Sequence, residues 1–435
     1  MTSFRLDESI TADRKIQDVF NLFEDTSQVD APKESGWVAM TFKPTLKAAM
    51  LVASPAQGPC PKLPINSAPE IDAMIAKNAV IAFSVSGGKD GNAAAIATVA
   101  YLDKMGHTGP RVLIHADLGV VEWKDSLPCC ERLAEKLGLE LMVVRRRAGD
   151  MMDRWEGRWR NNVQRFADLS CVKLILPWST PSMRFCTSEL KSAIIASALR
   201  KRFPDETIVS VTGIRREESA NRAKMDVCGI DARLTRRHAV GLFWNAIIDW
   251  HIEQVFQTII DTGLALHEAY TKYDSSRVSC VFCIMSAAKD LVAAANCEDN
   301  HQIYRRMVEL EVTSTYAFQG GKWLGDVAPH LLAADLVERL HQAKQVSALR
   351  QEIESKIPKH LLYSKGWPTS MPTKEEAELL AEIRKSVAGL VGIEIQFTTA
   401  ESILERYALL IATKALKDAS ASKSIEKKIE AEERG

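Results

Sequence analysis

The chain has 435 residues, and its 56 Lys+Arg balance its 56 Asp+Glu to a formal net charge of zero. This balance excludes a generally basic nucleic-acid coat protein and an acidic tail protein. The composition, 46% hydrophobic and 26% charged, is that of a soluble globular protein, and the length suggests two or three domains. No run of about 18 uncharged apolar residues and no secretory signal is found, so we expect a cytoplasmic protein without a membrane span.

Composition divides the chain into three segments. Residues 1–66 form an N-terminal extension with a Pro-rich stretch, residues 67–300 a core domain, and residues 301–435 a mostly helical C-terminal region. The first helix of the core domain is expected from Pro69 to about Asn78, with Ser67 as its N-cap. Two capping boxes predict helices in the C-terminal region: Thr373 with Glu376, and Thr398 with Glu401.

Short apolar runs alternate with helical segments in the core domain. The apolar runs cover residues 79–86, 112–119, 139–145 and 206–214, and helical patterns lie between them. This alternation predicts an α/β domain whose parallel sheet has helices on both faces. Ligands of such sheets bind beyond the carboxyl ends of the strands, which here are the loops after Ser86, Asp117 and Gly213.

The segment SVSGGKDG, from Ser84 to Gly91, follows the first apolar run and opens a helix. Gly87 and Gly88 let the backbone turn and approach an anion, while the helix N-terminus and Lys89 add positive potential. The segment is not a Walker loop, because aspartate follows the lysine where that motif needs Ser or Thr, and it does not match the dinucleotide fingerprint. The sequence therefore predicts a phosphate-binding loop of another type.

The SGGKD core after a strand resembles the pyrophosphate-binding loop of the ATP pyrophosphatase (PP-loop) superfamily, in particular its phosphoadenylylsulfate (PAPS) reductase branch. Later segments extend the resemblance over about residues 79–285. These segments are His115-Ala-Asp117-Leu-Gly119 with Glu122-Trp123, then Arg184-Phe-Cys186-Thr187 with Lys191, then Gly213-Ile-Arg215 with Glu218, Ser219 and Arg222, then Asp249-Trp250 with Val255-Phe256, and finally Ser276-Arg277-Val-Ser-Cys280-Val-Phe-Cys283. The resemblance implies an adenine nucleotide alpha-hydrolase-like fold for the core domain.

The resemblance also implies which residues bind ATP and which act on it. Catalytic roles are expected for Lys89, Asp90, Arg184 and Arg215. Nucleotide contacts are expected from Ser84, Ser86, Gly87, Gly88, Lys89, Asp90, Gly91, His115, Asp117, Lys191, Gly213, Arg215, Glu218, Ser219 and Arg222. The family loop usually continues with serine, and Gly91 in its place removes one hydroxyl donor to phosphate.

The middle of the chain carries an excess of positive charge, which suits the binding of a nucleotide. Residues 184–238 contain 12 Lys+Arg and 7 Asp+Glu, an excess of five positive charges that suits a polyphosphate; a solvated helix face is the alternative. Asp90 and Asp117 are candidate Mg²⁺ ligands, although each could instead cap a helix. Glu218 and Ser219 could contact ribose, or the glutamate could only stabilise the N-terminus of a helix through the helix dipole.

Three cysteines of the nine form a candidate metal site. Cys280 and Cys283 make a CxxC pair. In relatives of the PAPS reductase branch that carry a cluster, cysteines from this segment and from the segment of Cys186 come together, so that Cys186, Cys280 and Cys283 would supply three ligands. The resemblance therefore implies a [4Fe–4S] cluster, with Cys228 or Cys297 as the candidates for a fourth ligand. Zinc is the competing occupant, and three unliganded thiols are the third alternative.

The other cysteines are not expected to take part in chemistry. Cys129 and Cys130 belong to an apolar helix face and are predicted to be structural, while Cys60 and Cys171 have no identifiable partner.

The leading hypothesis is an ATP-dependent adenylyl-transferring enzyme with sulfur-transfer chemistry, similar to family members that act in nucleic-acid thiolation, including DNA phosphorothioation. No cysteine lies beyond Cys297, whereas thioredoxin-dependent PAPS reductases use a nucleophilic cysteine near their C-terminus. A PAPS or adenylylsulfate reductase and a non-catalytic nucleotide sensor are the alternatives. The partners expected besides the adenine nucleotide are a nucleic-acid acceptor and a sulfur-donor protein, and a homo-oligomer is left open.

Overall fold

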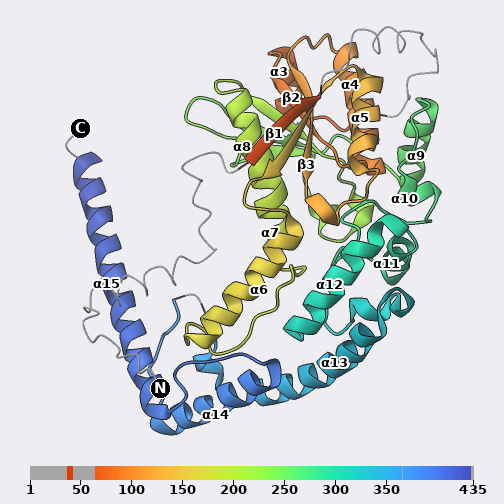
Figure 1. Ribbon diagram of the computed structural model, residues 1–435. Coiled ribbons are helices and arrows are strands. Elements are labelled where there is room, and N and C mark those ends of the chain that lie inside the picture. Colours follow the sequence, from red (N-terminus) through yellow and green to blue (C-terminus); the bar gives the residue numbers. More distant parts are fainter. Residues whose placement is uncertain (1–36, 43–63, 365, 433–435) are drawn as a thin grey trace, which may run out of the picture.

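The computed structural model describes residues 37–42, 64–364 and 366–432. The predictions made for Cys60 and for most of the N-terminal extension lie outside these residues. Within them the chain forms one sheet with covering helices, followed by a helical C-terminal region (Figure 1).

Seven strands form a single sheet in the order β1-β4-β3-β2-β5-β7-β6. The five central strands are parallel, and the edge strands β1 and β6 run antiparallel to their neighbours. The strand bounds are Trp37–Phe42 (β1), Val80–Ser84 (β2), Arg111–Asp117 (β3), Glu140–Arg146 (β4), Ile208–Val211 (β5), Cys228–Ile230 (β6) and Gly241–Trp244 (β7). The four strands predicted from the sequence are β2, β3, β4 and β5, and the predicted parallel sheet is confirmed.

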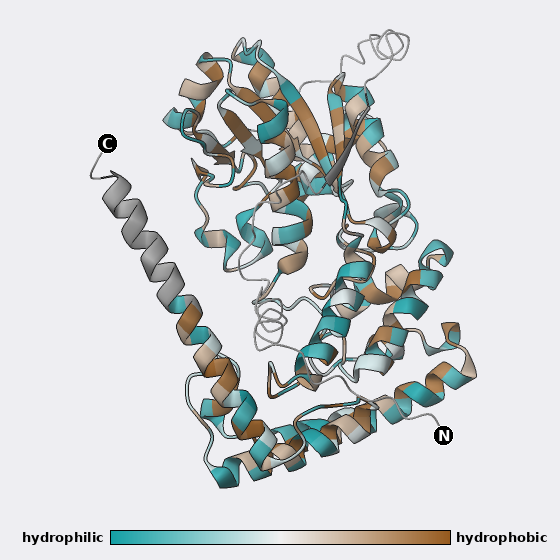
Figure 2. Ribbon diagram, turned by 60° about the vertical axis from the view of Figure 1, so that its left-hand side comes forward, coloured by the Kyte–Doolittle hydropathy of each residue, from teal (hydrophilic) through white to brown (hydrophobic). Residues whose placement is uncertain are grey.

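Helices cover both faces of this sheet, as predicted. On one face α3 (Pro69–Ala76), α4 (Lys89–Lys104), α5 (Ser126–Leu137) and α9 (Ile252–Asp261) share a hydrophobic core with the strands. On the other face α8 (Ala193–Arg202) packs against the strands. Because Ile81 and Phe83 of β2 face the first core while Val80 and Ala82 face the second, the strand is apolar throughout, as strands buried on both faces are. Figure 2 shows hydrophobic residues concentrated in the strands.

The remaining helices and the C-terminal region share a third hydrophobic core. Their bounds are Met151–Ala167 (α6), Phe185–Thr187 (α7), Glu268–Thr271 (α10), Ala288–Ala295 (α11), His301–Ser314 (α12), Ala334–Glu354 (α13), Lys374–Val391 (α14) and Ala400–Glu432 (α15). Trp155 and Trp159 of α6 belong to the same core as residues of α12, α14 and α15. None of the described helices combines the length and the hydrophobicity that a membrane span needs.

Two buried arginines fasten the last helices to α6. Arg384 of α14 donates to the carbonyl oxygens of Phe166 and Ala167, and Arg406 of α15 donates to that of Asp168. These carbonyls end α6, where a helix has unpaired acceptors and its dipole favours positive charge.

The predicted helix starts are confirmed in one case and corrected in two. The capping box of Thr373 and Glu376 is present at α14. The box of Thr398 and Glu401 is wrong by one residue, because α15 begins at Ala400 and Thr399 exchanges hydrogen bonds with Ser402. Ser67 is not the N-cap of α3: Ala68 is, and the Ser67 hydroxyl donates to Asp72 Oδ1 at 2.7 Å.

Candidate functional site

The predicted phosphate loop lies between β2 and α4, at the carboxyl end of a central strand. Gly87 has φ +76°, a left-handed conformation that favours glycine, and a Cβ there would lie 3.0 Å from the Ser126 carbonyl oxygen. Gly88 immediately precedes the first turn of α4, so the free N–H groups of that turn begin at the loop. The local structure is that of an anion-binding loop at a helix N-terminus.

Gly213 brings the segment after β5 against this loop. A Cβ at Gly213 would lie 2.3 Å from the carbonyl carbon and oxygen of Asp90 and 2.6 Å from the Gly91 nitrogen. Only glycine permits this approach. The elements GGKD and GIR, more than 100 residues apart in the sequence, are therefore in direct contact because β2 and β5 are parallel neighbours.

Arg215 forms the charged centre of that contact. Its side chain is buried, its Nε donates to Asp90 Oδ1 at 2.7 Å, and its guanidinium also pairs with Glu217. Burial lowers the pKa of Arg215, but the charge and hydrogen bond of Asp90 outweigh this effect and raise it. As the structure stands, Arg215 holds the loop through Asp90.

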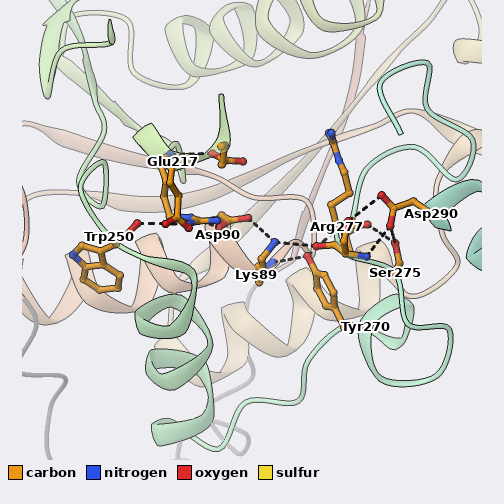
Figure 3. Close-up of polar contacts among 12 residues, drawn as sticks. Lys89, Asp90, Glu217, Trp250, Tyr270, Ser275, Arg277 and Asp290 are labelled. Atoms are coloured by element: carbon orange, nitrogen blue, oxygen red, sulfur yellow. Dashed lines mark hydrogen bonds and ion pairs between the residues drawn. The ribbon is translucent and has the colours of Figure 1, made fainter. Parts of the chain in front are cut away.

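Lys89 is buried beneath aromatic side chains and is 4% exposed. Its Nζ lies 3.2 Å from Asp90 Oδ2 and 3.3 Å from the Ser276 carbonyl oxygen, and it lies 5.4 Å from the ring centre of Tyr270. Figure 3 shows it between Asp90 on one side and Tyr270 with the Ser275–Arg277 stretch on the other. The lysine of the loop is therefore linked to the segment that carries Cys280 and Cys283.

His115 is fully buried and contacts the backbone of Val85, within the predicted phosphate loop. One ring nitrogen donates to the Val85 carbonyl oxygen at 3.1 Å and the other to Glu122 Oε2 at 3.0 Å. A carbonyl oxygen and a carboxylate both accept, so the charged imidazolium satisfies both contacts. Burial lowers the pKa of His115, but the hydrogen bonds with Cys130 and Glu122 outweigh burial and raise it well above its ordinary value of 6.5. His115 thus positions Val85 rather than facing a ligand.

This arrangement predicts a specific pH dependence of stability. Because the folded-state pKa of His115 is raised, its stabilising contribution is complete below about pH 6.5 and is lost as the pH rises through the folded-state value. We expect the free energy of unfolding to fall on the alkaline side by up to about 1.4 kcal/mol per pH unit, and His115→Asn to lack this fall. Urea denaturation from pH 6 to pH 9 measures both.

His107 provides the control for this prediction. Its ring is buried as well, but burial lowers its pKa, so His107→Asn should keep the alkaline loss. An identical pH profile in the wild-type protein and His115→Asn would contradict the charged assignment.

The carboxylates proposed for Mg²⁺ already have protein partners. Asp90 contacts Lys89 and Arg215, and Asp117 Oδ1 accepts the Gly119 N–H at 2.7 Å while Arg145 lies 3.7 Å from Oδ2. Since Mg²⁺ in such sites is held largely by substrate phosphates and water, one or two carboxylates are all that the protein would supply. The ion stays a prediction.

The remaining cationic and polar site residues contact partners within their own segments. Arg222 pairs with Glu218, whose carboxylate also accepts the Arg215 N–H at 2.9 Å, and Ser219 Oγ accepts the Arg222 N–H at 3.3 Å. Arg184 is exposed before α7 and donates to Thr187 Oγ1 at 3.2 Å.

A pocket of about 390 Å³ adjoins the loop on the face of the sheet that α8 covers. It lies where the strand order reverses between β2 and β5, the place where open α/β sheets bind ligands. Its lining combines hydroxyl and amide groups with apolar side chains: Ser84, Ser192, Ile195, Ala196, Ser210, Thr212, Ile214, Met225, Ile230, Asp231, Arg233, Leu234, Phe243 and Asn245. Of the predicted site residues, Ser84 lines it directly.

The three cysteines of the proposed metal site share one neighbourhood. Burial raises the pKa of Cys280 to about 12; Lys191 opposes this shift, while Cys283, Glu122 and Cys186 reinforce it. Ionisable groups shift the pKa of a neighbour only at short range, so Cys186 and Lys191 lie near the CxxC pair, as the resemblance implied. The candidates for a fourth ligand have other partners. The Cys228 sulfur lies 3.9 Å from Glu70 Oε2, and Cys297 forms a side-chain hydrogen bond with Tyr273.

These thiols do not form a ready metal site. Across residues 37–42, 64–364 and 366–432, no group of three or more His, Cys, Asp or Glu side chains is arranged to hold a metal ion. The [4Fe–4S] cluster and zinc therefore both stay predictions. Cys129 and Cys130 are both fully buried on α5, which confirms their structural assignment.

Some residues that shape the site were not found from the sequence. Tyr270, Asp290 and Gln319 each contact the loops of the site, and their positions in the sequence carry no local motif. The only signal was that Tyr270 lies six residues before Ser276, where the last family segment begins.

Comparison with known proteins places these elements in a family. Residues 80–286 match the family described as the phosphoadenosine phosphosulfate reductase domain. A crystal structure of phosphoadenylyl-sulfate (PAPS) reductase from Candida auris, a phosphate complex, is similar at 12% identity and a TM-score of 0.30, covering 50% of this chain and 98% of that one. No curated protein matches the chain. The match over residues 80–286 includes the phosphate loop, Gly213, Arg215 and the CxxC pair, so this part of the chain is a phosphoadenosine phosphosulfate reductase domain.

Proposed function

We propose that this protein binds ATP at the phosphate loop and transfers its adenylyl group to an acceptor, as the activating half of a sulfur-transfer reaction. The observation that carries the proposal is the contact of GGKD with GIR: Gly213 against the Asp90 backbone, and Arg215 Nε at 2.7 Å from Asp90. The glycine-lined loop that carries Lys89 lies at the reversal of strand order, with a pocket beside it, which supports the proposal.

The pocket and the loop suit the two parts of a nucleotide. Apolar side chains such as Ile195 and Phe243 offer a surface for a base, and Ser84 marks where the pocket meets the loop. The N–H groups at the start of α4 and the ammonium group of Lys89 suit the phosphates. We place the adenosine in the pocket and the β- and γ-phosphates at the loop.

In the proposed reaction an acceptor oxygen attacks the α-phosphorus of ATP. The bond from the α-phosphorus to the bridging oxygen breaks, and pyrophosphate leaves with the electron pair. The loop amides and Lys89 hold the leaving group, and Mg²⁺ bound with the nucleotide would supply further compensation of its charge. Arg215 keeps Asp90 in place during the step.

The sulfur-transfer half requires a donor. The terminal sulfur of a persulfide on a donor protein would displace AMP from the adenylylated acceptor, so that the bond between the acceptor and the AMP oxygen breaks as the bond to sulfur forms. A second thiol would then attack the donor sulfur of the resulting disulfide, which releases the thiolated acceptor and leaves the donor and that thiol joined by a disulfide. A nucleic acid is the acceptor class that we propose. No step is assigned to a cluster, because the described thiols do not form a metal site.

The test is release of pyrophosphate from Mg·ATP in the presence of DNA or transfer RNA and a persulfide donor. We expect release in the wild-type protein, and in Lys89→Met a fall in ATP affinity of about tenfold or more, since a charged hydrogen bond is worth about 1.5–3 kcal/mol. Calorimetry gives the affinity. Lys104→Met, at the exposed far end of the same helix, should behave as the wild-type protein does.

Failure to release pyrophosphate under these conditions would reject adenylyl transfer. Sulfite released from PAPS in the presence of thioredoxin would instead establish the reductase.

Gly91 gives specific support to a nucleotide sensor as a second candidate. A Cβ at Gly91 would lie 3.5 Å from the Ser84 carbonyl oxygen, which is an ordinary contact, so the serine usual in the family fits here. Tight ATP binding without turnover in both the wild-type protein and Gly91→Ser would establish the sensor.

A further inference from the structure

Tyr270 lies between the phosphate loop and the segment that carries the cysteine pair, residues 275–283, here called the cysteine segment. Its hydroxyl oxygen accepts the backbone N–H of Lys89 at 3.2 Å and that of Val278 at 3.1 Å. A hydroxyl oxygen has two acceptor lone pairs, and both are used. One atom therefore joins two loops that are nearly 190 residues apart in the sequence.

Packing fixes the position of this oxygen. The Tyr270 ring lies edge-on to Phe256 at 6.0 Å and to His267 at 6.4 Å between ring centres. His267 is itself fully buried, and a Cβ on Gly87 would lie 3.1 Å from its ring. The tyrosine cannot move without disturbing the phosphate loop.

Lys89 has two groups that suit a phosphate, its backbone N–H and its Nζ, and both already form hydrogen bonds with protein groups. The backbone N–H of Lys89 is bound by Tyr270, and its Nζ is bound by the carbonyl oxygen of Ser276, the second residue of the cysteine segment. A phosphate that attracts either group must change a bond that leads to the cysteine segment.

The cysteine segment is also held at its other contacts. Asp290 of α11 accepts the Ser276 N–H at 2.7 Å and its hydroxyl at 3.0 Å, and the Val281 N–H donates to the Val121 carbonyl at 2.8 Å. Gln319 of the C-terminal region donates to the Cys283 carbonyl at 3.2 Å. A segment held at several points transmits a displacement rather than absorbing it.

We propose that Tyr270 is a positioning residue that couples the phosphate loop to the cysteine segment, so that anion binding at the loop changes the accessibility of Cys280 and Cys283. This inference goes beyond adenylyl transfer, which requires no such coupling. The part of it that concerns ATP rests on the proposed function.

The first test needs no nucleotide. Tyr270→Phe keeps the ring and removes only the hydroxyl, so hydrogen exchange should quicken about fivefold in both residues 85–91 and residues 276–283. Tyr101→Phe is the matched control: Tyr101 lies on the same α4 as Lys89, and its hydroxyl donates to Asp72 at 3.0 Å away from the loop. It should leave both segments unchanged. Faster exchange in only one segment, or in neither, overturns the proposal.

The second test separates coupling from a merely structural role. In the wild-type protein, saturating Mg·ATP should change the rate at which iodoacetamide alkylates Cys280 and Cys283 by about fivefold or more. In Tyr270→Phe that change should fall below about twofold, with calorimetry showing that ATP is still bound. A full ATP effect in Tyr270→Phe overturns the coupling. If the wild-type protein binds no ATP, adenylyl transfer fails, and the exchange experiment alone decides the role of Tyr270.

Discussion

Replacing Arg215 with methionine is expected to lower the free energy of unfolding by about 3 kcal/mol or more, because it leaves carboxylates next to a buried side chain without their cation. Arg215 is 3% exposed and contacts Asp90 and Glu217. Asp90 would keep only Lys89 as a cationic partner and would repel phosphate more strongly at the start of α4, so ATP affinity should fall by about tenfold or more. Urea denaturation and calorimetry measure the two effects.

Two further variants make this prediction specific. Arg215→Met combined with Asp90→Asn also removes the carboxylate that has lost its arginine and should recover part of both losses. Arg339→Met removes an ion pair with Glu309 on the surface of the C-terminal helices and should cost less than about 1 kcal/mol. If Arg215→Met and Arg339→Met were equally stable, Arg215 would not be the charged centre of the site.

Gly213→Ala is expected to damage the phosphate loop directly. The new Cβ would lie 2.3 Å from the backbone of Asp90, so the strand end and the loop must separate. Overpacking of this kind costs about 1–3 kcal/mol or more, and a displaced loop should bind ATP at least about tenfold more weakly. Thermal denaturation and calorimetry with Mg·ATP test the stability and the affinity.

Gly91→Ala is the matched control for Gly213→Ala. It adds the same methyl group one residue beyond Asp90, where the nearest atom is the Ser84 carbonyl oxygen at 3.5 Å. Because Gly91 lies in the first turn of α4, alanine should keep or raise stability, by up to about 1 kcal/mol. Equal losses in the two variants would show that the close approach at Gly213 has no special role.

The helical region was less accessible to sequence reasoning than the sheet. The capping box at Thr373 is a local pattern and is predicted correctly. Thr398 fits the same pattern because Glu401 follows three residues later, but the structure pairs Thr399 with Ser402 instead. The buried arginines Arg384 and Arg406 look like surface residues in the sequence. Only packing against the end of α6 shows that they bind its carbonyl groups.

The proposed metal site shows another limit. Cys186 and the CxxC pair could be brought together by resemblance, and the structure places them near one another. Metal ligation depends on the relative directions of the sulfur atoms, which spacing in the sequence does not encode. The structure therefore leaves the cluster as a prediction, although the proximity of the cysteines agrees with it.

The sequence by itself determined the features that depend on local pattern: the apolar runs of a sheet buried on both faces, the glycine-rich turn into α4, and the family to which residues 80–286 belong. The tertiary structure decided which distant groups meet. Arg215 neutralises Asp90, His115 carries a proton to hold Val85, and Tyr270 joins two loops through one oxygen. These contacts could not be read from the chain because each joins residues on different elements, and the order of strands in the sheet and the packing of helices over it bring them within hydrogen-bond distance.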